Sequence, residues 1–108
     1  MIFNTGAALL DAVVLSVVSR EVHGTYGYKI THDVQEVISV SESTLYPVLR
    51  RLLKDGCLES YDQEYQGRNR RYYQITNAGI VQLNMYKQEW SEYTMKFNKL
   101  FVGGNENG

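Results

Sequence analysis

The chain has 108 residues, of which 44% are hydrophobic and 21% charged, and its formal net charge is −1. A chain of this length forms one domain with a modest core. The near-zero charge excludes a polybasic protein that binds nucleic acid over its whole surface. The single cysteine, Cys57, excludes an internal disulfide and is expected to be a small buried residue rather than a redox sensor.

The first half of the chain contains two predicted helices. Gly6 to Ser19 is apolar over more than half of a helical circumference, so we expect a central core helix, with a strand as the alternative because valines are frequent. This run includes Asp11 and is too short to span a bilayer, and we expect a cytoplasmic protein. After a loop, Tyr26 to Ile38 is predicted to form the second helix. Its Tyr26 and Tyr28 are expected to pack this helix against the first helix or against the last helix of a partner chain.

The third predicted helix is amphipathic. Its apolar residues recur at helical spacing: Leu45, Val48, Leu49, Leu52 and Leu53. The opposite face and its flanks carry polar and basic groups: Ser43, Thr44, Tyr46, Pro47, Arg50, Arg51 and Lys54. Ser41 or Ser43 is expected to cap the helix, and with Ser43 as the cap Pro47 would fall in the tolerant first turn. Gly56 is expected to end it. Such a helix fits the major groove of B-DNA.

A hairpin follows the third helix. Leu58 to Tyr65 and Arg70 to Ile75 are predicted to be strands, joined by a loop at Gln66 to Asn69. Arg68 and Arg70 near its tip could reach phosphates or the minor groove, whereas strand alternation points Arg71 the other way. The fold class predicted is therefore mainly α with a small β-hairpin, α+β: a winged helix-turn-helix followed by a long C-terminal helix.

The last predicted helix begins after a cap at Thr76 and runs from Asn77 to Val102. Its apolar residues alternate at steps of three and four, as in a coiled-coil seam: Leu83, Tyr86, Trp90, Tyr93, Phe97 and Leu100. We expect this seam to pair with a second copy of the chain. The chain would then consist of a DNA-binding region at 1–76, a dimerisation helix at 77–102 and a disordered tail at 103–108, forming one compact unit.

Three motifs in this order resemble the PadR family of transcriptional regulators. They are Tyr26-Gly27-Tyr28-Lys29-Ile30, the stretch Ser43 to Leu52 with Asp55-Gly56 after it, and Gly67-Arg68 through Arg70-Arg71-Tyr72-Tyr73 to Ile75-Thr76 and Gly79. The single C-terminal helix resembles the short subfamily. Asn69 departs from the family, which often has proline or glycine there.

The resemblance implies a homodimeric repressor whose two recognition helices read an inverted-repeat operator in double-stranded DNA. The DNA-facing positions carried over are Ser43, Thr44, Tyr46, Pro47, Arg50, Arg51, Gly67, Arg68 and Arg70, and Lys54 shares the same helix face. Some small PadR proteins bind planar aromatic compounds between tryptophans of the last helices, and Trp90 occupies the matching place, near Tyr86 and Tyr93. Trp90 is thus a candidate either for dimer core or for a ligand platform.

Other functions are also open to this sequence. The acidic stem of the hairpin (Glu59, Asp62 and Glu64) suits a winged-helix protein-interaction module without DNA binding, and the aromatic seam suits a small-molecule carrier. We expect no enzyme and no cofactor, because no nucleophile–base set or phosphate-binding glycine loop is present. We expect no metal site either, because His23 and His32 lack zinc-ligand spacing.

Overall fold

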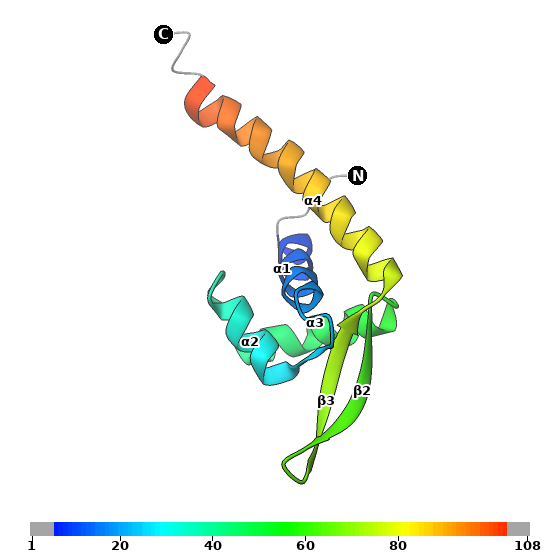
Figure 1. The fold of residues 1–108 in the computed structure, drawn as a ribbon. Helices are drawn as coiled ribbons and strands as arrows, with labels where there is room; N and C mark the ends of the chain where they lie inside the picture. Colours follow the sequence, from blue (N-terminus) through cyan, green and yellow to red (C-terminus); the bar gives the residue numbers. More distant parts are fainter. Residues whose placement is uncertain (1–5, 104–108) are drawn as a thin grey trace.

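Three helices pack around one hydrophobic core in the computed structural model, which describes residues 6–103 (Figure 1). They are α1 (Ala7–Ser19), α2 (Gly27–Gln35) and α3 (Glu42–Lys54). As predicted, α1 is a central helix, and it contacts α2, α3 and the C-terminal helix. The core side chains come from these four helices and from the start of the hairpin: Val14, Leu15, Val18, Ile30, Val34, Leu45, Leu49, Leu52, Leu58 and Leu83.

The second helix is shorter than predicted at both ends. Thr25 and Tyr26 form a strand, β1, and α2 starts only at Gly27. The strand exists because these two residues pair with Tyr73 and Tyr72 across the sheet. A strand of two residues has no sequence periodicity, so only its partner defines it.

The third helix is capped by Ser41, whose side-chain oxygen accepts a hydrogen bond from the Thr44 N–H at 3.3 Å. With this cap, Pro47 is the sixth residue of α3 and lies inside the helix. The placement of Pro47 in the first turn is therefore wrong. Since proline has no N–H, the Ser43 carbonyl lacks the usual helical donor four residues on. Gly56, with a φ of 78°, ends the helix as predicted.

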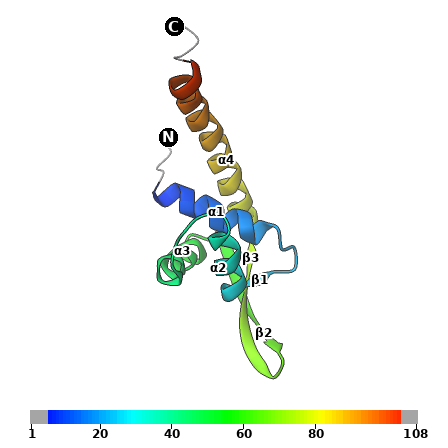
Figure 2. The same ribbon diagram turned by 90° about the vertical axis from the view of Figure 1, so that its left-hand side faces the viewer.

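The hairpin forms the wing, consisting of β2 (Leu58–Tyr65) and β3 (Arg68–Ile75). With β1 it makes an antiparallel sheet in the order β1-β3-β2. The predicted loop was too long, because the turn is only Gln66 and Gly67, both with positive φ (53° and 80°). Such values suit a tight two-residue hairpin turn. The wing extends away from the helices, as Figure 2 shows from the side.

The C-terminal helix, α4 (Asn77–Asn98), begins at the predicted Thr76 cap and passes into a π-helical segment, η1 (Lys99–Gly103). The first half of α4 packs on α1, and the rest projects, so the molecule measures 65 × 26 × 22 Å (Figure 1). Of the expected tail at 103–108, residues 104–108 lie outside the described residues. Among residues 6–103, no helix combines the length and apolar character needed to cross a membrane.

Candidate DNA-binding surface

The outer face of α3 is exposed along its length because its inner face is fixed in the core. Leu45, Val48, Leu49 and Leu52 are buried, whereas Leu53 is only partly buried. The residues predicted to face DNA are all exposed: Ser43, Thr44, Tyr46, Pro47, Arg50, Arg51 and Lys54. Their hydroxyl, ammonium and guanidinium groups are the types that contact base edges and phosphates.

Arg51 differs from the other members of this face. Its guanidinium donates to the carboxylate of Asp11 on α1, and the Tyr86 hydroxyl of α4 donates to the second oxygen of that carboxylate at 3.2 Å. The Asp11 side chain is only 10% exposed and that of Arg51 43%. Arg51 thus ties α3 to α1, a role that the sequence analysis missed because Asp11 lies 40 residues away.

The same environment raises the pKa values of Asp11 and Tyr86. Burial raises the pKa of Asp11 above its ordinary value, although the positive charge of Arg51 opposes this. Burial, followed by the neighbouring Asp11 carboxylate, raises the pKa of Tyr86 to about 12. Tyr86 therefore remains a neutral hydrogen-bond donor at physiological pH.

The wing places its arginines on different faces. Gly67 and Arg68 are exposed at the tip. Arg70 lies on the same sheet face as Arg68, two residues along β3. Arg71 lies on the other face, where its Nε is 3.6 Å from an oxygen of Asp62, so alternation separates it from Arg70 as predicted.

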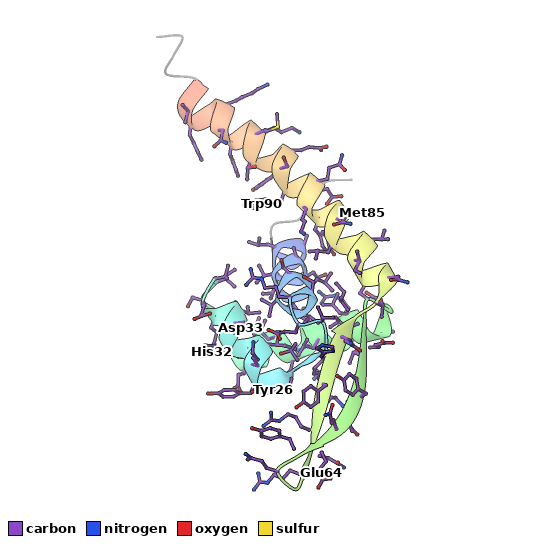
Figure 3. All side chains as sticks on the ribbon, viewed as in Figure 1. Tyr26, His32, Asp33, Glu64, Met85 and Trp90 are labelled. Atoms are coloured by element: carbon purple, nitrogen blue, oxygen red, sulfur yellow. The ribbon has the colours of Figure 1, made fainter. Side chains whose placement is uncertain are left out.

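One concave surface of about 560 Å³ joins the third helix to the wing. It is lined by Tyr26, Gly27, Tyr28, Tyr46, Arg70, Arg71 and Tyr73. Tyr46 comes from α3, the two arginines and Tyr73 from β3, Tyr26 from β1, and the other two from the start of α2. Tyr28 is 71% exposed, so its expected packing against another helix of this chain is wrong. Figure 3 shows Tyr26 in this region, between α2 and the wing.

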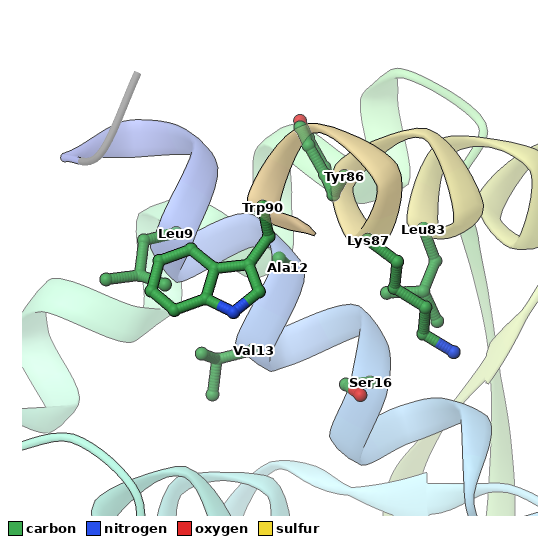
Figure 4. A pocket seen from close by; sticks show the side chains of 8 residues that line it. All are labelled: Leu9, Ala12, Val13, Ser16, Leu83, Tyr86, Lys87 and Trp90. Carbon is green, nitrogen blue, oxygen red and sulfur yellow. The ribbon is translucent and has the colours of Figure 1, made fainter. Parts of the chain in front are cut away.

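A second, apolar pocket of about 240 Å³ lies between α1 and α4, away from the wing. Figure 4 shows the indole of Trp90 beside Leu9, Ala12 and Val13 of α1. The remaining lining residues are Ser16, Leu83, Tyr86 and Lys87. Trp90 is 44% exposed, so its ring both borders this pocket and faces outward. Tyr93 does not line the pocket, although its ring centroid is 6.0 Å from that of Trp90.

The predicted seam of α4 divides into two parts. Leu83 and Tyr86 are buried in the core of their own chain, which corrects their assignment to a dimer contact. Further along, Trp90, Phe97 and Leu100 are exposed and Tyr93 is partly so. The ring centroids of Tyr93 and Phe97 are 4.6 Å apart, which makes this part of the helix a continuous aromatic surface.

The exposed side of α2 holds three groups with metal-binding chemistry. His32, Asp33 and Glu36 place one potential ligand atom each within 4.8 Å of one another. The sequence analysis considered the histidines alone and did not find this cluster. Lys29 donates to Asp33 at 2.9 Å and lowers the pKa of that carboxyl. Because the ammonium group of Lys29 already binds the Asp33 carboxylate, we assign no metal here.

Comparison with known proteins identifies the family of this chain. The transcriptional regulator PadR-like family matches residues 14–85. The structure of smu.1704 from Streptococcus mutans is 40% identical, with a TM-score of 0.83 over 95% of each chain. A PadR-like transcriptional regulator from Bacillus cereus is 30% identical, with a TM-score of 0.80 over 91% of this chain and 96% of that one.

A more distant structure, Bacillus subtilis PadR in complex with operator DNA, shares the fold. It is 20% identical, with a TM-score of 0.64 over 72% of this chain and 46% of that one. The family match covers α3 and the wing, which build the exposed basic face, and also the first part of α4. The chain belongs to the PadR-like family of DNA-binding transcriptional regulators and is not an enzyme.

Proposed function

We propose that the protein is a homodimeric repressor that binds an inverted-repeat operator and is released by a planar aromatic effector. The observation that carries the DNA-binding part is the concave surface on which Tyr46 of α3 meets Arg70 and Arg71 of the wing. It makes the exposed face of α3 continuous with the wing, so one stretch of duplex can contact both. This function places the protein where the DNA is, in the cytoplasm.

The two elements would read DNA in different ways. The exposed Ser43, Tyr46 and Arg50 on α3 would contact bases in the major groove, with Thr44, Pro47 and Lys54 beside them. Gly67, Arg68 and Arg70 would contact phosphates or the minor groove. Arg51 contributes through its tie to Asp11 and through its long-range charge rather than as a free base-reading side chain.

Dimerisation would use the projecting part of α4. Its exposed apolar residues are Trp90, Met95, Phe97, Leu100, Phe101 and Val102. A surface of this size and character marks an interaction site, and a second copy of the chain is the partner that two-fold symmetric operators require. Residues 77–86 then belong to the protomer core and the remainder of the helix to the interface.

The pocket beside Trp90 is the proposed effector site. It is almost entirely apolar, and an indole at its edge can stack on a flat ring. Titration of the dimer with planar aromatic cations, followed by Trp90 fluorescence, tests this part. Quenching together with loss of operator binding supports it, whereas an unchanged operator affinity contradicts release by an effector.

The DNA-binding part is tested by fluorescence anisotropy with labelled DNA from upstream of the protein's own gene, at two salt concentrations. Tight, salt-sensitive binding that an unrelated duplex of equal length does not share is the expected result. Equal, weak binding to both duplexes would call for selection from genomic fragments. If selection also fails, the exposed acidic stem at Glu59, Asp62 and Glu64 would favour a protein-interaction module.

A further inference from the structure

The Arg70 side chain is held between two tyrosines from different elements. Its Cζ atom lies 4.0 Å from the ring centroid of Tyr26, at the junction of β1 and α2. The same atom lies 4.0 Å from the ring centroid of Tyr65, the last residue of β2 before the turn. The guanidinium therefore lies over two aromatic faces, an arrangement favoured by the cation–π attraction.

The strand register explains how these groups meet. Gln63 is opposite Arg70 and Tyr65 is opposite Arg68, so Tyr65 and Arg70 are diagonal neighbours on one face of the wing. Tyr26 is opposite Tyr72, two residues beyond Arg70 on the same face, and their ring centroids are 5.8 Å apart. The contacts thus run from the β1–α2 junction to the end of β2.

The contacts of Arg70 with Tyr26 and Tyr65 connect the wing to the helical part of the molecule. A two-stranded ribbon that extends from a domain is only marginally ordered by its own hydrogen bonds. Arg70 ties the outer part of this ribbon, through Tyr65, to Tyr26 at the start of α2. These contacts oppose a change in the angle between the wing and the helices in the absence of DNA.

The contacts with the two tyrosine rings leave the edge of the Arg70 guanidinium available for hydrogen bonds. A guanidinium stacks on an aromatic ring through its face, whereas its N–H groups all lie in its plane and point to its edge. Within residues 6–103, these N–H groups make no hydrogen bond to another residue. A planar fork with free edge donors matches two oxygens of a phosphate.

We propose that Tyr26 and Tyr65 are positioning residues that hold Arg70 edge-on for a phosphate of the DNA backbone. This inference rests on the proposed DNA-binding function and adds that the tyrosines act through Arg70, not by touching DNA. An arginine fixed in this way loses little conformational freedom on binding. Replacement of either ring should therefore weaken DNA binding only as long as Arg70 is present.

A double-mutant cycle on the full-length protein tests the proposal. The probe is a fluorescein-labelled duplex that the wild-type protein recovers from random-sequence DNA. Tyr65→Leu should weaken binding roughly two- to fivefold, the size of an exposed cation–π contact. Tyr65→Phe is the matched control and should bind as the wild type does, because phenylalanine keeps the aromatic face. In an Arg70→Gln background, Tyr65→Leu should have no further effect.

Two other outcomes of the double-mutant cycle would overturn the proposal. An equal loss from Tyr65→Leu in both backgrounds would show that Tyr65 acts without Arg70 and would overturn the proposal. A loss in Tyr65→Phe as large as in Tyr65→Leu would show that the hydroxyl matters instead of the ring, with the same consequence. Either result would leave the DNA-binding function itself intact, because the wild-type protein would still bind its selected duplex.

A second measurement tests, without DNA, whether Tyr26 and Tyr65 hold the Arg70 side chain. In proton NMR, the side-chain protons of Arg70 should be shifted upfield by the two rings in the wild type and in Tyr65→Phe. They should move toward ordinary arginine positions in Tyr65→Leu. Ordinary chemical shifts of Arg70 in the wild type would show that the two rings do not hold it, and would overturn the proposal even if DNA binding were established. The expected upfield shifts would support the contact of Arg70 with the rings even if no duplex were selected.

Discussion

Arg51 of α3 and Asp11 of α1 form an ion pair in which the acid is buried and the base is nearly half exposed. Tyr86 of α4 completes the arrangement by donating to the same carboxylate. Three elements with different proposed tasks therefore meet at one carboxyl group: the core helix, the recognition helix and the helix that borders the Trp90 pocket. The orientation of α3 depends on this group as well as on hydrophobic packing.

The unequal burial of the pair predicts unequal effects of removing its members. Arg51→Met should lower the free energy of unfolding by about 1–3 kcal/mol at neutral pH, because it leaves a buried carboxylate with Tyr86 alone. Asp11→Asn should cost less than about 1 kcal/mol, because the exposed Arg51 can turn to water. Urea unfolding of the two variants and the wild type measures both values.

The raised pKa of Asp11 sets the pH dependence of this effect. A carboxyl whose pKa is raised by folding stabilises the fold below its unfolded-state pKa, and this contribution is lost as the pH rises through the folded-state pKa. Removing Arg51 raises the pKa of Asp11 further, so the deficit of Arg51→Met should be larger near pH 7 than near about pH 4. A deficit that is the same at both pH values would contradict the assignment.

The exposed arginines should affect DNA binding and leave stability unchanged. Arg50→Ala should cost roughly 1–3 kcal/mol of binding free energy and relax base preference at one position. Arg68→Ala should weaken binding to all sequences and reduce the salt slope by about one. Anisotropy titrations at several salt concentrations measure both effects, and Arg20→Ala, which removes an equal charge from the exposed end of α1, is the control. Loss of thermal stability in either arginine variant would reveal a structural role instead.

Gly79 lies in the first turn of α4, a position where helix propensity alone would favour alanine. An alanine at residue 79 should favour the helix by about 1 kcal/mol. However, its Cβ would overlap the backbone carbonyl of Cys57, and it would also crowd Ile75. We therefore expect Gly79→Ala to lower the free energy of unfolding by roughly 1–3 kcal/mol, as overpacking does. Thermal unfolding followed by circular dichroism would show this, and a raised midpoint would contradict the close approach.

Gln66 in the wing turn is a position where a substitution should stabilise the protein. This residue has a φ of 53°, a conformation that glutamine tolerates poorly and asparagine well. Gln66→Asn creates the Asn-Gly pair favoured in such turns and should stabilise the protein by roughly 0.5–1 kcal/mol. Gly67→Ala should do the opposite, since its φ is 80°. Chemical denaturation compares the two, and equal effects of the same sign would argue against the turn geometry.

The elements that the sequence predicted best are those with strong local signals. In α3, the spacing of Leu45, Leu49 and Leu52 determines which face is buried, and the same geometry leaves Arg50 outside. The cap at Thr76 and the termination at Gly56 also follow from local chemistry.

The features that local signals missed depend on distant partners. β1 exists through pairing with Tyr72 and Tyr73, and Arg51 finds Asp11 on another helix. Arg50 and Arg51 are adjacent and chemically identical, yet one turns toward solvent and the other toward α1. Only the packing of α3 on α1 separates them, which no pattern within α3 contains.

The projection of α4 beyond the core makes the proposed repressor sensitive to its own abundance. The exposed aromatic part of this helix would leave water only when a second chain covers it, so part of the folding free energy would be bimolecular. The thermal midpoint of the dimer should then rise with total protein concentration. Since two chains are needed to place two recognition helices on one operator, promoter occupancy would increase more steeply than in proportion to the amount of protein. The quantity of regulator in the cell would thus set a threshold for repression.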